Sequence, residues 1–274
     1  MKSSLYLSAL ALSLSSSGAF GAEDMPDFSQ IVQLSLIEGW QQEDGTRVGA
    51  LKVTLAEGWK TYWRVGGDTG IPPRFDWSGS SNLASVEYLW PRPHIVDSGG
   101  LRAIGYKNEL ILPIRFAPET PGMAINASAQ LDIGVCKDVC VPVQASISSA
   151  LGTGDGTDQF LIELALADRP DTSAEAGLEE ASCVFTPTED GYRLNAEFTL
   201  PADAENTEFV VFETPNPEVW VAPAILSRVG NHLLAETSLV SYGEVKSVVD
   251  PEDLRVTIIW ADRAVEFQGC APSG

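Results

Sequence analysis

The chain has 274 residues, 44% hydrophobic and 20% charged, so it can bury a sizeable core and is not disordered as a whole. Its formal net charge of −21 argues against binding to nucleic acid or to anionic membrane surfaces. The length fits one large or two ordinary domains. Most of the excess negative charge lies in the second half of the chain, which suggests two units.

The first residues, 1–21, have the features of a secretory signal peptide. Lys2 supplies a positive charge, residues 5–14 form a short apolar run, and small residues precede a cleavage point before Ala22. A short buried helix is the alternative. No later run approaches the roughly 18 apolar residues of a membrane helix, so we expect no membrane span in the mature chain. In a Gram-negative bacterium the mature protein would lie in the periplasm, where disulfides persist.

Residues 22–150 are predicted to form a first β domain. The segments "IVQLSLI", "VGALKVTL" and "ELILPIRF" are short and rich in β-branched or alternating apolar residues. Turn-forming stretches such as "EDGT", "GGDTGIPP" and "PETPG" fall between them. Short strands at near-regular spacing, with no long helical pattern among them, favour a β-sandwich.

Residues 151–177 are predicted to be a linker, and residues 178–274 a second β domain. In the linker, "DQFLIELALADRP" predicts a short helix with Asp158 as its N-cap and Pro170 as its stop, and "DTSAEAGLEEA" is acidic. The β pattern then returns in "EFVVFET", "HLLAETSLV" and "LRVTIIW", with a hairpin turn at residues 189–191. The sequence therefore predicts an all-β protein of two sandwich domains joined by a short helical and acidic linker.

Four cysteines allow three pairings, and their placement favours Cys136 with Cys140 and Cys183 with Cys270. Cys183 and Cys270 lie in or beside predicted strands near the two ends of the second domain, where terminal strands of a sandwich can meet. A bridge there closes a loop of about 88 residues and stabilises the domain by roughly 4–5 kcal/mol in the chain-entropy model. We predict a structural disulfide. A second redox pair and two free thiols are the alternatives.

Cys136 and Cys140 flank a three-residue connection between two predicted strands. Facing residues across such a hairpin mouth have Cα atoms about 4.5–5.5 Å apart, which is within disulfide range. Bridging so small a loop removes little chain entropy, which weakens a purely stabilising role. A strained bond at a loop tip would be accessible and easier to reduce. From spacing alone, a structural staple, a redox pair and a metal clip stay open.

Other kinds of chemistry have little support in the sequence. Zinc normally takes four nitrogen or sulfur ligands, and beyond its cysteines the chain has only His94, His232 and three methionines. We predict no metal site and no cofactor, although two-coordinate Cu(I) on the cysteine pair stays open. Neither histidine has a supporting catalytic motif, and no GxSxG, Walker or GxGxxG motif occurs.

The stretch "EGWKTYWRVGGDTGIPPRFDWSGSSNLASVEYLWPRP", followed by "GYKNELILPI" and "GVCKDVCVP", resembles the N-terminal periplasmic domain of the DsbD-type thiol:disulfide interchange reductases. The resemblance is closest to the branch of suppressor-of-copper-sensitivity protein B. It covers residues 30–150 or so and extends more loosely across the second β domain. It implies two immunoglobulin-like domains, with Cys136 and Cys140 as the reactive pair.

The resemblance also implies a shield around this pair. In the family a cap loop between two strands covers the cysteines, and "DSGGLRAIG" stands in the corresponding place. The family's shielding aromatic is absent from that segment, so Leu101 or Ile104 would take its role. Tyr62 and Trp63 match an aromatic-rich strand that lies near the pair in the family. Ordinary core packing is the alternative for both aromatics.

Electron transfer through this protein is likewise implied by the resemblance. In the family the domain takes electrons from a membrane domain and passes them to thioredoxin-like partners outside the cytoplasm. The family's membrane and thioredoxin-like domains do not occur in this sequence, so we expect a separate membrane electron donor and thioredoxin-like periplasmic partners. Family analogy makes Cys140 the cysteine that joins partners. The better-known members space their cysteines more widely.

The functional hypothesis is a periplasmic thiol–disulfide exchange protein, either a protein-disulfide reductase or a component of a thiol–disulfide interchange system. Lys137 would favour a thiolate on Cys136, and Asp138 would oppose it. Two alternatives stay open. One is a Cu(I)-handling module for copper tolerance, and the other is a structural β-sandwich interaction protein with two inert disulfides.

Overall fold

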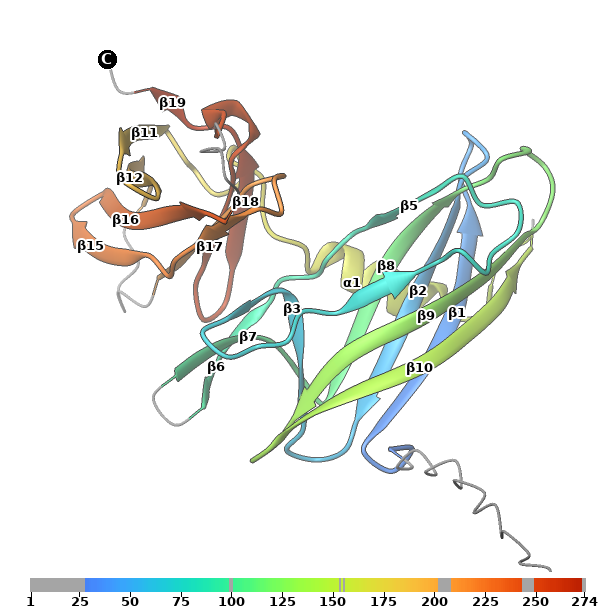
Figure 1. Ribbon diagram of the computed structural model, residues 1–274. Helices are drawn as coiled ribbons and strands as arrows, with labels where there is room; N and C mark the ends of the chain where they lie inside the picture. The colour runs from blue at the N-terminus through green and yellow to red at the C-terminus, as the bar shows by residue number, and fades with distance from the viewer. Residues whose placement is uncertain are drawn as a thin grey trace, which may run out of the picture.

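The computed structural model of the protein describes residues 28–98, 101–152, 154, 156–201, 208–242 and 249–272. The signal peptide expected at residues 1–21, and the expected start of the first domain at residue 22, lie outside these ranges. The described chain consists mainly of strands, with α1 (Gln159–Ala167) between two strand-rich units (Figure 1). The predicted all-β architecture of two sandwich-like domains is confirmed. No helix among the described residues is long and apolar enough to cross a membrane.

The first domain places two sheets around one apolar core. The smaller sheet has the strand order β1-β2-β8-β5, with bounds β1 (Val32–Gln41), β2 (Arg47–Leu55), β8 (Glu109–Ala117) and β5 (Ser85–Tyr88). The larger sheet has the order β10-β9-β3-β7-β6, with β4 paired to β9. Its bounds are β10 (Cys140–Leu151), β9 (Ile125–Cys136), β3 (Lys60–Gly67), β7 (Leu101–Lys107), β6 (His94–Ser98) and β4 (Arg74–Asp76).

Residue alternation along the strands builds the core of the first domain. Strand β9 buries every second side chain from Ile125 to Ile133, as expected when one face of a sheet packs inward. Two large aromatic side chains of this core, Trp63 and Phe116, are each 0% exposed. Burial of such aromatic side chains is a main source of the domain's stability.

The predicted linker helix is present, and it packs against the first domain. It follows Asp158 and ends at Ala167, before Pro170. Ile162 is fully buried and clusters with Val48 and Ala50 of β2. The helix is therefore packed against the first domain and is not a flexible linker.

The second domain also has two sheets. The larger has the order β14-β16-β12-β11-β19, with β15 paired to β16; the smaller has the order β13-β17-β18. The bounds of the larger sheet are β14 (Val219–Val221), β16 (His232–Ser241), β12 (Gly191–Thr199), β11 (Glu180–Pro187), β19 (Ala271–Pro272) and β15 (Ile225–Val229). The smaller sheet comprises β13 (Phe209–Glu213), β17 (Arg255–Ile259) and β18 (Ala264–Gln268), and a 3₁₀ turn, η1 (Pro251–Asp253), precedes β17.

The small sheet of the second domain is buried on both faces. Val210 and Phe212 of β13 belong to the core of their own domain. Phe209 and Val211, which point the other way, belong to the apolar cluster that forms the core of the first domain. The two domains are therefore joined through a continuous apolar interface, which opposes the relative motion usual between domains.

Candidate functional site

The hairpin of β9 and β10 brings the first cysteine pair together at its tip. Cys136 ends β9, Cys140 begins β10, and the two are register partners with Cα atoms 4.1 Å apart. Their sulfurs are joined in a disulfide. The three residues between them are exposed, so the bond lies at a projecting loop.

The two cysteines differ sharply in exposure. Cys136 is 1% exposed, whereas Cys140 is an exposed residue. The difference arises because β9 lies inside the sheet, next to β3, while β10 lies at the end of the strand order. Cys140 is therefore the more accessible of the two cysteines to an incoming nucleophile, and Cys136 is enclosed by the surrounding side chains.

Tyr62 of β3 places its hydroxyl against both sulfurs. Its oxygen lies 2.5 Å from Sγ of Cys136, to which the hydroxyl donates, and 3.2 Å from Sγ of Cys140. Burial raises the pKa of Tyr62, so the phenol stays protonated near neutral pH and remains a donor. Strand pairing fixes this approach, because Lys60 is the register partner of Cys136 and Thr61 that of Val135.

Gly134 allows the Tyr62 ring to lie on β9. A Cβ at position 134 would stand 2.7 Å from Cβ of Ile71 and 3.1 Å from ring atoms of Tyr62. Thr61 reinforces this contact, because its hydroxyl donates to the carbonyl of Gly134 at 3.0 Å. The first residue of "GVCKDVCVP" is therefore part of the site, although the cysteine spacing gave no sign of it.

The residues expected to shield the pair lie in different places. Tyr62 does contact the sulfurs, and with Ala103 and Cys136 it forms a small buried cluster. Trp63 and Ile104 belong instead to the main core, because neighbouring residues of a strand point to opposite faces. Leu101, at the start of β7, is 49% exposed. On β7, the residue that packs with Tyr62 and Cys136 is therefore Ala103, one residue before Ile104.

Charged groups around the pair come from both strands and turns. Lys60, the neighbour of Cys136 in the sheet, is only 7% exposed. Lys137 is exposed and donates from Nζ to the carbonyl of Glu57 at 3.3 Å. Asp138 is exposed at the loop tip. Among the described residues no group of three or more His, Cys, Asp or Glu side chains is arranged to hold a metal ion.

A groove runs beside the exposed cysteine. Its volume is about 750 Å³, and its walls include Ile71, Val141 and Pro142. Val141 and Pro142 directly follow Cys140 in the sequence, so the groove lies along the start of β10. Its lining is mainly apolar, which suits a segment of another polypeptide.

The second cysteine pair has a different setting. Cys183 of β11 and Cys270 are joined in a disulfide with Cα atoms 5.5 Å apart. They are 3% and 4% exposed and belong to the core of the second domain. The bond fastens the C-terminal strand β19 beside β11, where the two strands run parallel. Neither sulfur is accessible to a protein partner.

Together, the fold and this site describe a two-domain all-β protein with one disulfide at a hairpin tip and one in a core. Residues 30–151 match the family model described as "Thiol:disulfide interchange protein DsbD, N-terminal". These residues, just under half of the chain, are therefore similar to a DsbD-type N-terminal domain, as the sequence motifs indicated.

Comparison with solved structures extends the likeness over both domains. The crystal structure of the N-terminal periplasmic domain of ScsB from Proteus mirabilis matches with a TM-score of 0.63 and 20% sequence identity. That match covers 89% of this chain and 92% of the other, so the two share the two-domain fold. The DsbD N-terminal domain of Neisseria meningitidis, in its reduced form, is 14% identical over 48% of this chain and 94% of its own, with a TM-score of 0.29. No curated protein matched the sequence.

Proposed function

We propose that this protein is a periplasmic thiol–disulfide exchange protein and that Cys136 and Cys140 are its redox pair. The observation that carries the proposal is the asymmetry of the pair. Cys140 is an exposed residue at a hairpin tip, whereas Cys136 is buried and accepts a hydrogen bond from the hydroxyl of Tyr62. Exchange needs one sulfur that a partner can reach and one that the protein keeps in place to resolve the intermediate.

The reaction follows from this arrangement. In the reduced protein, the Cys140 thiolate attacks one sulfur of a partner disulfide, a mixed disulfide forms, and the partner's other sulfur leaves as a thiolate. The Cys136 thiolate then attacks the Cys140 sulfur, and the partner's second sulfur leaves. Two electrons pass to the partner, whose disulfide becomes a dithiol, while Cys136 and Cys140 become the disulfide. A separate dithiol donor at the membrane returns the pair to its reduced form by the reverse steps.

Tyr62 acts on the sulfur that carries charge during exchange. A hydrogen bond from a neutral hydroxyl to a thiolate is charge-assisted and stronger than one between neutral groups. Because Cys136 is buried, its thiolate would otherwise lack solvation. Tyr62 therefore lowers the free energy of the reduced, ionised pair.

The partner that best fits this site is a thioredoxin-like periplasmic protein. Its polypeptide beside the reactive cysteine would occupy the groove lined by Val141 and Pro142, next to Cys140. Within the protein we assign residues 22–150 to the redox domain, 151–177 to the linker and 178–274 to a second immunoglobulin-like domain. Cys183 and Cys270 form a structural disulfide in that second domain.

Trapping of the mixed disulfide tests this proposal. The full chain carrying Cys136→Ser is mixed with a thioredoxin-like protein whose disulfide is intact. We expect a covalent adduct that dithiothreitol dissolves, because exposed Cys140 attacks and no Cys136 thiol remains to resolve the adduct. The Cys140→Ser variant should trap far less, because Cys136 is buried.

A double variant, Cys183→Ser with Cys270→Ser, serves as the matched control and should still exchange if it folds. The proposal fails if neither single variant traps the partner and the wild-type pair is not oxidised by it. A Cys136–Cys140 reduction potential well below about −300 mV would instead mark the bond as a structural disulfide.

A further inference from the structure

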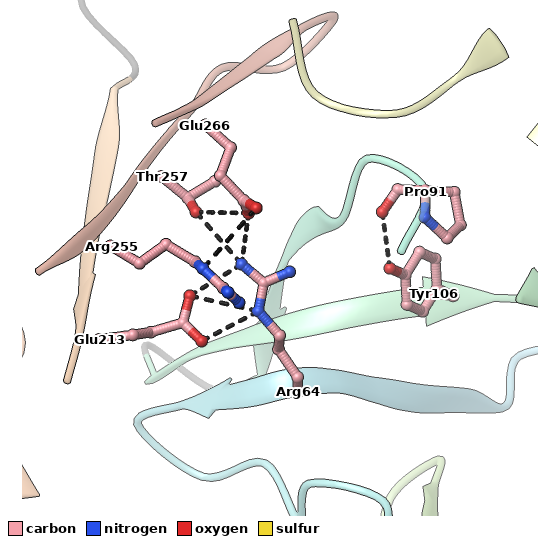
Figure 2. A network of polar contacts seen from close by, with 7 residues as sticks. All are labelled: Arg64, Pro91, Tyr106, Glu213, Arg255, Thr257 and Glu266. Carbon is pink, nitrogen blue, oxygen red and sulfur yellow. Dashed lines mark hydrogen bonds and ion pairs between the residues drawn. The ribbon is translucent and has the colours of Figure 1, made fainter. Parts of the chain in front are cut away.

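Arg64 of strand β3 forms ion pairs with the second domain. Arg64 projects from β3 to the second domain, where its guanidinium meets the carboxylates of Glu213 and Glu266 (Figure 2). Its Nε donates to Oε1 of Glu213 at 2.9 Å, and its Nη2 donates to Oε2 of Glu213 at 2.8 Å. The Nη2 group also donates to Glu266. Such paired hydrogen bonds fix the guanidinium in position and in orientation.

Arg64, Glu213 and Glu266 form an ion-pair node that is largely buried. The side chains of Arg64 and Glu213 are 16% and 19% exposed, and the guanidinium lies 4.1 Å from the centre of the Trp63 ring. Burial alone would lower the pKa of Arg64, but the hydrogen bonds and charges of Glu213 and Glu266 outweigh it and raise the pKa. A second cation, Arg255, lies 3.9 Å from Glu266 and helps to balance the two carboxylates.

Backbone pairing is weak in the part of β3 that carries Arg64. Strand β3 pairs regularly with β7 from Lys60 to Tyr62, and the register is then irregular until Gly67. Its pairing with β9 is at Lys60 and Thr61. Residues 63–66 follow this paired region, so side chains have a large share in placing them. Trp63 anchors this segment by packing in the core of the first domain, and Arg64 anchors it by binding carboxylates of the second domain.

Arg64 and the tyrosine of the redox site are neighbours on this strand. Residues two apart in an extended chain have Cα atoms about 7 Å apart. Tyr62 therefore lies close to Arg64 along β3, and its hydroxyl contacts the sulfurs of Cys136 and Cys140. The residue that contacts the second domain and the residue that contacts the disulfide are thus only two positions apart in β3.

We propose that the second domain positions Tyr62 for thiol–disulfide exchange and that Arg64 is the positioning residue through which it acts. This inference rests on the proposed function of the cysteine pair. When Glu213 and Glu266 hold Arg64, β3 is fixed just beyond Tyr62, and the hydroxyl stays over the Cys136 sulfur. When the node is broken, β3 gains freedom there, and the hydrogen bond to the Cys136 thiolate weakens.

The test compares Arg64→Met, Tyr62→Phe and the double variant in the full chain. The reduced proteins are titrated through their ultraviolet thiolate absorbance, and each is equilibrated with glutathione. We expect Arg64→Met to leave roughly threefold less thiolate at a given pH, a rise of about half a unit in the thiol pKa. The glutathione equilibrium should shift toward the disulfide. Tyr62→Phe should shift both in the same direction and at least as far.

Arg64→Met in the Tyr62→Phe background should change neither quantity further, because both substitutions act on one hydrogen bond. Arg115→Met, which breaks an exposed ion pair with Glu87 in the same domain, is the matched control and should leave both quantities unchanged. Should Arg64→Met fail to fold, Glu213→Gln weakens the same node and retains Arg64 and Glu266; it should give a smaller shift of the same sign.

A node that is merely structural would behave differently. Arg64→Met or Glu213→Gln would then lower the unfolding temperature and leave the thiol pKa and the glutathione equilibrium as in the wild type, and that result overturns the inference. Full additivity with Tyr62→Phe overturns it as well. Both readouts use the chemically reduced protein, so they give an answer even if no thioredoxin-like partner is trapped. Failure of the proposed function is therefore distinguishable from failure of this inference.

Discussion

At the scale of single residues, the proposed redox site depends on small differences between neighbours. Cys136 and Cys140 have the same chemistry and share one disulfide, yet one is buried and the other exposed. Tyr62 and Trp63 are adjacent aromatics, but only Tyr62 faces the sulfurs. The motif around the cysteines predicted that this pair is the reactive one, and that stays a prediction; the face on which each aromatic lies follows from strand register.

Gly134 provides a prediction at this scale. We expect Gly134→Ala to lower the free energy of unfolding by about 1–3 kcal/mol, because the added methyl group overlaps Ile71 and the Tyr62 ring. Urea denaturation of the oxidised proteins measures the loss. Gly152→Ala is the matched control, since a methyl group there meets no atom within 4 Å. Equal urea midpoints for Gly134→Ala and the wild type would contradict the prediction.

At the scale of elements, strand β3 connects the main parts of the molecule. It pairs with β9 beside Cys136, sends Trp63 into the first core and sends Arg64 to the second domain. The aromatic-rich segment "KTYWRV" was expected to lie near the pair, but its alternation gave no sign of a contact with a domain about 150 residues later. Such a contact depends on how two separate folding units meet.

The two disulfides should differ strongly in what they contribute to stability. They join residues 4 and 87 positions apart in the sequence. Replacing Cys183 and Cys270 by Ala should cost roughly 4–5 kcal/mol, because a long loop in the unfolded chain is released. Replacing Cys136 and Cys140 by Ala should cost about 2 kcal/mol in the same chain-entropy model. Urea denaturation of both double variants measures the difference, and the reverse order would contradict the prediction.

At the scale of the whole molecule, the two domains share packing. Phe209 and Val211 of β13 join the first core, while Val210 and Phe212 join the second. From the sequence, "EFVVFET" was predicted as a strand, and its run of apolar residues is explained by burial on both faces. A continuous apolar interface of this kind makes the domains unfold together when it is strong enough.

Phe209 provides the prediction for the whole molecule. Its ring is 6% exposed and lies 4.7 Å from the guanidinium carbon of Arg102 on β7. We expect one calorimetric unfolding transition for the wild type and a loss of about 3–5 kcal/mol in Phe209→Ala. Ile225→Ala, at a side chain that is 75% exposed, is the control and should change stability by about 0.5 kcal/mol or less. Two well-separated wild-type transitions would show that the domains do not unfold as one unit.

The sequence by itself determined the strand pattern, the linker helix and the position of the cysteine pair at a hairpin tip, because these depend on residue alternation and on short spacings. The exposure of Cys140, the contact of Tyr62 with both sulfurs and the closeness of its ring to Gly134 were decided by the tertiary structure. So was the clamp of Glu213 and Glu266 on Arg64. These features depend on strand order, register and the meeting of two domains, which join residues far apart in the chain.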